Sequence, residues 1–142
     1  MSKTDIADAF RIVPMHPSQY CLFGFVWREQ FYYDRCLPMG CSASCKIFET
    51  LSNALQWIAS SKLHIRNISH VLDFLLLARD KAVDQAQLIS FLSMCADICI
   101  PVAPDKTVQP TQVITFLGLE LDSVILQYLF SPEIIVCMPQ TQ

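Results

Sequence analysis

Two aspartates in apolar surroundings are the residues of this sequence best suited to chemistry. Asp5 lies near the start of the apolar run 4–13, and Asp73 lies inside the run 68–78. A carboxylate in an apolar strand needs a partner, because an unpaired buried charge is costly. Two adjacent carboxylates can hold divalent metal ions about 3.5 to 4 Å apart, as in phosphoryl and nucleotidyl transfer. Alternatively, Asp73 caps a turn or pairs with Arg79. Spacing alone leaves both interpretations open.

Hydrophobic periodicity predicts the elements that must position these aspartates. In chain order we expect a strand in residues 4–13, a hairpin over 20–27 and 30–34, a helix from Ser42 or Ser44 to about Ser60, a strand over 68–78, a helix over 80–95 and a strand over 113–122. This order predicts an α+β fold of the split-βαβ type, with an RNA-recognition or ferredoxin-like sheet and helices on one face. Such a sheet would bring the two aspartates side by side.

The same periodicity predicts which side chains of the helices are buried. On the first helix these are Ile47, Phe48, Leu51, Ala54, Leu55 and Ile58, and on the second Leu88, Phe91, Leu92 and Cys95.

Composition bounds the class of protein. The chain has 142 residues, of which 53% are hydrophobic and 16% charged. The charged fraction is below the roughly 25% of ordinary soluble domains, which indicates one domain or a piece of a larger one. No apolar stretch reaches the roughly 18 residues of a membrane span, and residues 1–5 carry no secretory signal. We therefore expect an intracellular chain, neither secreted nor membrane-bound.

Charge and cysteine content limit two further classes of function. The net charge is −3, and the basic residues are scattered, so positive surface for nucleic acid must come from a partner or from further sequence. Seven cysteines are an odd number, which argues against a complete disulfide framework. Cys36, Cys41 and Cys45 lack zinc-knuckle spacing, which favours free thiols over a metal site.

Five short motifs then occur in the order found in reverse transcriptases. Residues 5–10 (DIADAF) resemble motif A, and residues 37–44 (LPMGCSAS), together with Ile47 and Phe48, resemble motif B. Residues 70–75 (HVLDFL) resemble motif C. Residues 104–107 (PDKT) resemble motif D, and residues 116–122 (FLGLELD) resemble motif E. The sequences of these motifs most resemble those of retrotransposon polymerases of the tyrosine-recombinase and long-terminal-repeat kinds. The resemblance implies a polymerase palm over residues 1–123, a divergent tail over 124–142, and RNA-directed DNA polymerase activity.

The resemblance also implies roles for individual residues. By this resemblance the catalytic residues are Asp5, Asp73 and Lys106, and the ligands of two Mg²⁺ ions, which Mn²⁺ can replace, are Asp5, Asp73 and the carbonyl of Ile6. The residues that would bind the nucleotide are Phe10, Pro38, Met39 and Gly40. The primer grip would consist of Phe116, Leu117 and Gly118. Phe10 is alternatively an ordinary core residue, and Lys106 an ordinary exposed lysine. The implied partners are an RNA or DNA template-primer and a deoxynucleoside triphosphate.

Departures from the family pattern predict weak or absent activity. Motif C has one aspartate, Asp73, where two consecutive ones are usual, and a one-residue shift would turn side chains to the opposite face of a strand. Fingers and thumb are expected to be largely missing, so other segments, including a ribonuclease H region, or a second chain would complete the enzyme. The alternative is a non-catalytic nucleic-acid-binding remnant of a retrotransposon polyprotein. Its aromatics would stack on bases or pack within the hairpin: Tyr20, Phe23, Phe25, Trp27, Phe31, Tyr32 and Tyr33.

Overall fold

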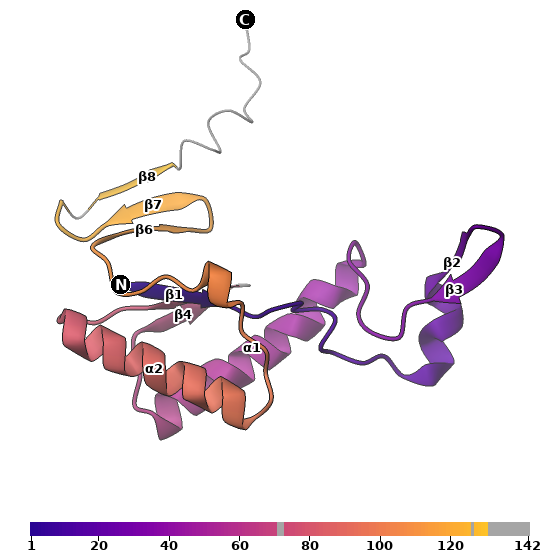
Figure 1. Cartoon of the computed structure of the whole chain (residues 1–142), viewed down its shortest axis with the longest axis horizontal. Helices are drawn as coiled ribbons and strands as arrows, with labels where there is room; N and C mark the ends of the chain where they lie inside the picture. The colour runs from indigo at the N-terminus through magenta and orange to yellow at the C-terminus, as the bar shows by residue number, and fades with distance from the viewer. Residues whose placement is uncertain (71–72, 126, 131–142) are drawn as a thin grey trace, which may run out of the picture.

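A three-stranded antiparallel sheet lies at the centre of the molecule. The computed structural model describes residues 1–70, 73–125 and 127–130. Strands β1 (Ser2–Asp5), β5 (Asp73–Leu76) and β4 (Ile68–His70) form the sheet in the order β1-β5-β4. Figure 1 shows both long helices on one side of this sheet and a second three-stranded sheet on the other side. The fold is therefore α+β with small antiparallel sheets.

Alternation along β5 explains why the central sheet is covered on both faces. Phe74 and Leu76 belong to the main core cluster, together with Phe48 of α1 (Ser42–Lys62) and Phe91 of α2 (Lys81–Asp97). Leu75 points the other way, because successive side chains of a strand alternate. It packs in a separate cluster with residues of strand β6 (Val113–Phe116).

Both predicted helices form, but their ends and the buried face of α1 differ from the prediction. The buried side of α1 contains Ser44, Phe48, Ser52, Leu55 and Ala59. Leu51 and Ile58 pack against the core as predicted, but Ile47 is 44% exposed and Ala54 is exposed, so both predictions were wrong. The buried face of the helix instead includes Ser44 and Ser52. On α2, Leu88, Phe91 and Cys95 are buried and Leu92 is packed against the core, as predicted.

The start of α1 also differs from the prediction. Its N-cap is Cys41, without a side-chain capping bond, rather than Ser42 or Ser44. The hydroxyl of Ser44 instead donates a hydrogen bond to the carbonyl of Pro38 at 2.8 Å. The serine is thus used to hold the preceding turn against the helix.

Two predicted strands are in fact hairpins. The run 68–78 divides into β4 and β5, and residues 71–72 of motif C lie outside the described residues. The run 113–122 divides into β6 and β7 (Leu119–Asp122), because Leu117 and Gly118 turn the chain with φ of 51° and 78°. Strand β8 (Gln127–Phe130) continues this sheet beside β7, within the segment 124–142 that we predicted as a tail. Residues 126 and 131–142 of that segment lie outside the described residues.

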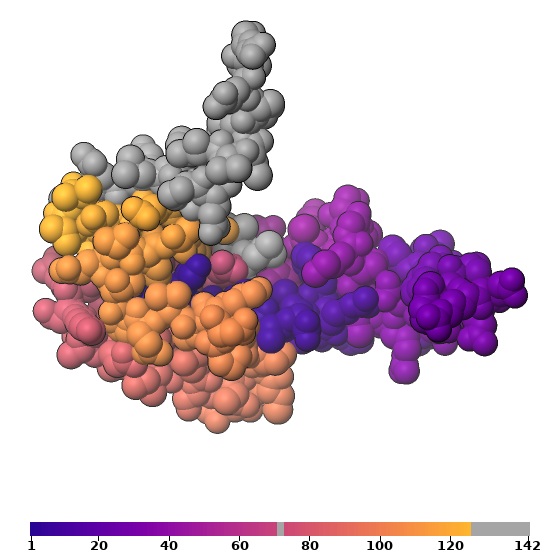
Figure 2. Space-filling model, turned by 45° about the horizontal axis from the view of Figure 1, so that its top comes forward, coloured from indigo at the N-terminus to yellow at the C-terminus, as the bar shows by residue number. Residues whose placement is uncertain are grey.

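The β2–β3 hairpin lies at one end of the molecule, and the sheet of β6, β7 and β8 lies at the other end. Strands β2 (Gly24–Trp27) and β3 (Gln30–Tyr33) pair as predicted, but residues 20–23 belong to a 3-10 helix, η1 (Pro17–Phe23). Figures 1 and 2 show this purple segment projecting beyond the amino-terminal end of α1. Neither described helix has the length and hydropathy to cross a membrane.

Candidate active site

The register of the central sheet places Asp5 directly opposite Asp73. Residues opposite each other in an antiparallel pair project to the same face, with their Cβ atoms about 4.5 to 5.5 Å apart. By alternation, Asp73 shares its face with Leu75, and Asp5 shares its face with Lys3. The two carboxylates therefore lie together on the face of the sheet that the helices do not cover.

Burial and the neighbouring Asp5 both disfavour the charged form of Asp73. Burial raises the pKa of Asp73, and the charge of Asp5 and a side-chain hydrogen bond with Asp5 raise it further. The ammonium groups of Lys3 and Lys106 lower it in part. A pair of carboxylates in this condition favours a shared proton or a bound cation.

Lys106 is the cation in contact with the pair. Its Nζ lies 2.7 Å from Oδ2 of Asp5, and the lysine side chain is 63% exposed while that of Asp5 is 14% exposed. The hydrogen bond to Asp5 and the charge of Asp5 raise the pKa of Lys106. Lys106 and Asp5 are 101 residues apart in the sequence, so only the fold brings them together.

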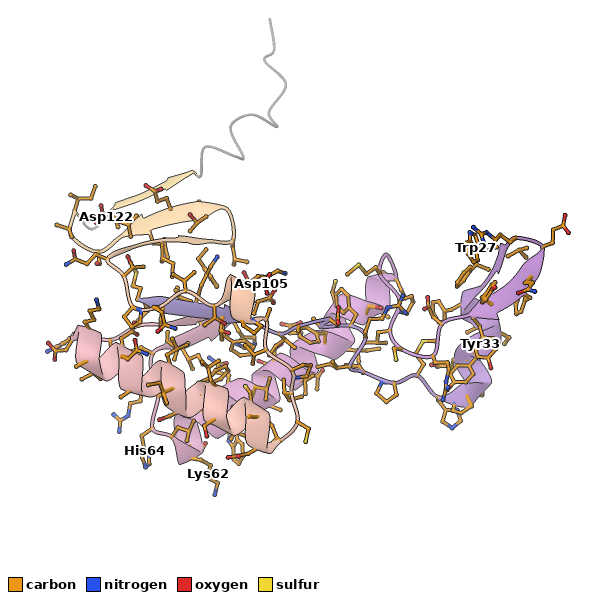
Figure 3. All side chains as sticks on the ribbon, viewed as in Figure 1. Trp27, Tyr33, Lys62, His64, Asp105 and Asp122 are labelled. Carbon is orange, nitrogen blue, oxygen red and sulfur yellow. The ribbon has the colours of Figure 1, made fainter. Side chains whose placement is uncertain are left out.

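A loop across β1 positions Lys106. Val108 bridges Lys3 and Val102 bridges Ile6, so the chain between them runs along the free edge of β1. Residues 103–107 span only Thr4 and Asp5 on the strand, and the excess forms the 3-10 turn η2 (Pro104–Lys106). The amide of Ala103 donates to the carbonyl of Asp5 at 2.9 Å, and the Thr4 and Thr107 hydroxyls bond at 2.8 Å. Figure 3 shows Asp105, the neighbour of Lys106, beside β1.

Lys3 is a site residue that sequence reasoning missed. It lies two residues before Asp5, and its Nζ donates to the carbonyl of Thr115 at 2.7 Å. Thr115 pairs with Glu120 in β6–β7, next to the tight turn. The carbonyl of Thr115 is directed to the free edge of β6, because hydrogen-bonded and non-bonded pairs alternate along the hairpin. The signal available in the sequence was the period of two in a strand, which puts Lys3 on the face of Asp5.

The residues expected to grip a primer pack close to the carboxylate pair. Phe116, at the end of β6, is buried against Leu75, which is two residues from Asp73 on the same face. Leu117 and Gly118 form the turn beyond it, and Leu117 is 49% exposed. The structure therefore brings this turn to the face that carries Asp5 and Asp73, although its role stays a prediction.

The residues expected to contact a nucleotide gather at the start of α1. Phe10 is partly buried against the main core and packs edge-on against Phe48, with ring centroids 5.7 Å apart. The turn at Pro38 is held by Ser44, one helical turn before Phe48. Met39 is 80% exposed. Gly40 has a φ of 85° and open space around the position of a Cβ.

The donor set agrees with a hard divalent cation in type. Carboxylate oxygens from Asp5 and Asp73 and a backbone carbonyl from Ile6 are ligands that Mg²⁺ accepts. Among residues 1–70, 73–125 and 127–130, no three His, Cys, Asp or Glu side chains gather as a metal-binding group. A metal ion at the aspartate pair would therefore depend on backbone, water or substrate oxygens for its other ligands.

Comparison with known proteins identifies the fold. No protein-family model and no curated protein matches the sequence. A foamy viral protease-reverse transcriptase in complex with double-stranded DNA superposes with a TM-score of 0.81 at 18% identity, over 99% of this chain and 24% of that chain. The same kind of protein in complex with an RNA/DNA hybrid gives 0.77 at 18% identity, over 93% and 17%. Native prototype foamy virus protease-reverse transcriptase gives 0.71 at 24% identity, over 82% and 15%.

The chain thus spans about a quarter or less of the length of these three solved structures. The agreement extends over most of this chain, at low identity. It therefore concerns the arrangement of the elements. The chain has a reverse transcriptase-like fold.

Proposed function

We propose that this chain is the palm segment of an RNA-directed DNA polymerase, and that Asp5 and Asp73 are its catalytic carboxylates. The observation that carries the proposal is their cross-strand register on a reverse transcriptase-like fold. The edge segment 102–108, then β1, β5 and β4, follow the strand order of a split-βαβ sheet, which supports a palm. The five motifs support a retrotransposon polymerase as its origin.

Asp5, Asp73 and the carbonyl of Ile6 would hold Mg²⁺, with Mn²⁺ as a substitute and two ions by analogy with the family. The cross-strand placement of Asp5 and Asp73 supports this assignment, and the pKa of Asp73 is raised first by burial and then by the adjacent Asp5. Bound magnesium supplies positive charge that activates the attacking hydroxyl and stabilises the leaving oxygen.

The remaining residues would orient the reactants. Phe10 would lie beneath the sugar, and the turn of Pro38, Met39 and Gly40 beside the base, where a glycine lets a backbone come close. The primer 3′-oxygen attacks the α-phosphorus of the nucleotide, its proton passes to solvent water, and the bond between the α-phosphorus and the pyrophosphate oxygen breaks so that pyrophosphate departs. The ammonium of Lys106 would stabilise charge on that pyrophosphate. Phe116, Leu117 and Gly118 would hold the primer end.

Primer extension tests this function. We expect slow, Mg²⁺-dependent extension by the unmodified chain, because motif C has one aspartate, and faster extension when an aspartate is inserted after Asp73. Asp5→Asn and Asp73→Asn should each abolish extension. Asp97→Asn, an exposed aspartate at the end of α2, should leave it unchanged. Extension that survives Asp5→Asn, or no extension by any version including the insertion, would contradict the proposal.

Nucleic-acid binding without catalysis is the second candidate function. The observation that favours it is the exposure of rings on the β2–β3 hairpin, where Phe31 is 66% and Trp27 54% exposed. The guanidinium of Arg28 lies 4.3 Å from the centroid of the Trp27 ring, so a cation and an aromatic platform occur together. Exposed rings of this kind are the surfaces on which single-stranded bases stack. Binding that occurs without any extension would select this candidate.

A further inference from the structure

Lys106 contacts the carboxylate pair directly, through Asp5. Of the two lysines near the carboxylate pair, only Lys106 contacts a carboxylate, at 2.7 Å from Asp5, while the ammonium of Lys3 is bound to the carbonyl of Thr115. The loop that carries Lys106 is fixed to β1 on both sides, by Ala103 to Asp5 and by Val108 to Lys3. These backbone hydrogen bonds hold the loop so that Lys106 reaches Asp5.

We propose that Lys106 is an exchangeable counterion of the carboxylate pair, and that a divalent metal ion must displace its ammonium from Asp5 in order to bind. This inference rests on the proposed function, since it takes Asp5 and Asp73 as the metal ligands. It adds a competitive step between the protein's own cation and the metal. The lysine is then released in the same event that loads the site.

The geometry allows such an exchange at small cost. The side chain of Lys106 is 63% exposed, so its ammonium can leave Asp5 without moving the backbone and can be solvated at once. Asp5 is mostly buried and is fixed at the end of β1, so the carboxylate remains in place. An ion pair with one exposed, flexible partner is weak, and a doubly charged ion that contacts both carboxylates can outcompete it.

The exchange also connects the metal-free arrangement to the proposed chemistry. When its ammonium is released, Lys106 becomes a free cation beside the site, on a backbone that has not moved. That is the position from which it would meet the phosphates of a nucleotide. One lysine thereby serves the empty site and the loaded site in turn.

Mn²⁺ binding to the purified chain tests the exchange independently of any activity. Electron paramagnetic resonance of free Mn²⁺ gives the affinity, and a Mg²⁺ titration shows competition. We expect Lys106→Met to bind Mn²⁺ about two- to fivefold more tightly than the unmodified chain, the range expected when a weak exposed ion pair no longer has to be broken. Asp5→Asn should abolish the binding in both backgrounds.

Two further variants separate direct exchange from general electrostatics. Lys3→Met removes the same charge near the same carboxylates, but from a lysine that does not contact them, and should tighten binding less than Lys106→Met. Lys106→Arg keeps the charge and should not tighten it. Far-ultraviolet circular dichroism confirms that each variant is folded. Thermal unfolding gives a second measure, since the rise in Tm on adding Mn²⁺ should be largest for Lys106→Met.

The outcomes distinguish this inference from the proposed function. Saturable binding that requires Asp5 but is equal or weaker in Lys106→Met overturns the exchange and leaves the metal site intact. Equal tightening by Lys3→Met and Lys106→Met also overturns it, because charge alone would then explain the effect. Absence of Asp5-dependent binding in both the unmodified chain and Lys106→Met overturns the metal site, and the exchange with it. Binding that appears only in Lys106→Met supports the exchange.

Discussion

At the scale of single residues, the two aspartates repel each other in the folded chain, and this repulsion has a measurable effect on stability. Asp73 lies opposite Asp5, and its pKa is raised by burial and then by Asp5. Asp73→Asn removes one charge and keeps the shape, so we expect it to raise the free energy of unfolding at pH 7 without metal by roughly 0.2 to 1 kcal/mol, the range for cross-strand pairs. The same substitution should abolish activity.

The sign of the pH dependence follows from the same shift. Between the ordinary pKa of Asp73 and its raised value, the folded chain binds more protons at this residue than the unfolded chain, so its stability rises as the pH falls through that window. The advantage of Asp73→Asn should therefore shrink as the pH is lowered from 7 toward 4. Urea unfolding at several pH values measures it. An advantage that is independent of pH would show that the pKa of Asp73 is not raised in the folded chain.

At the scale of elements, the two tight hairpins differ in how well their turns suit the chain. Leu117 and Gly118 provide a glycine at the second turn position, whereas Arg28 and Glu29 both adopt positive φ, of 49° and 63°, without one. Two-residue hairpin turns of this kind favour Asn-Gly. Because a side chain in the left-handed region costs about 1 kcal/mol, Arg28→Asn with Glu29→Gly should slow amide exchange in β2 and β3. The Tm of the core should barely change, since this hairpin lies apart from it. Equal exchange in both proteins would contradict the assignment of strain to this turn.

Prediction from the sequence succeeded for elements that depend on local pattern and failed for turns and long-range contacts. Periodicity predicted α1, α2 and the β2–β3 pairing because each depends on neighbouring residues. It predicted one strand over 68–78 and one over 113–122, because apolar residues continue along both runs and Leu117 carries no turn signal of its own. The contact between Lys106 and Asp5 was not predictable from local pattern, because it depends on the loop 103–107 crossing β1. The tether of Lys3 to Thr115 likewise joins residues 112 positions apart.

At the scale of the whole molecule, the carboxylate pair and the exposed aromatics occupy different parts of the chain. Figure 3 shows Trp27 and Tyr33 on the hairpin and Asp105 near β1, well apart. The hairpin rings pack in stacked pairs, Phe25 on Tyr32 and Tyr20 on Tyr33, so the side chains support one another rather than the core. The prediction that these aromatics pack within the hairpin is correct in this respect, yet much of their surface stays in solvent. Exposed apolar surface of this kind marks a binding site.

This separation makes the binding role of the hairpin testable without the catalytic pair. If the rings stack on bases, Trp27→Ala with Phe31→Ala should weaken binding of single-stranded RNA by about tenfold or more, because each stacked base contributes about 1 to 3 kcal/mol. Mn²⁺ binding at Asp5 should not change.

The matched control is Trp57→Ala. Trp57 is 63% exposed on α1, and this variant should bind RNA like the unmodified chain. Fluorescence anisotropy at low and moderate salt measures the affinities. With a net charge of −3, stacking rather than phosphate contacts must supply most of the affinity, so the salt dependence should be shallow. RNA affinity that is unaffected by the hairpin substitutions, or lost equally in Trp57→Ala, would assign the apolar surface to another partner.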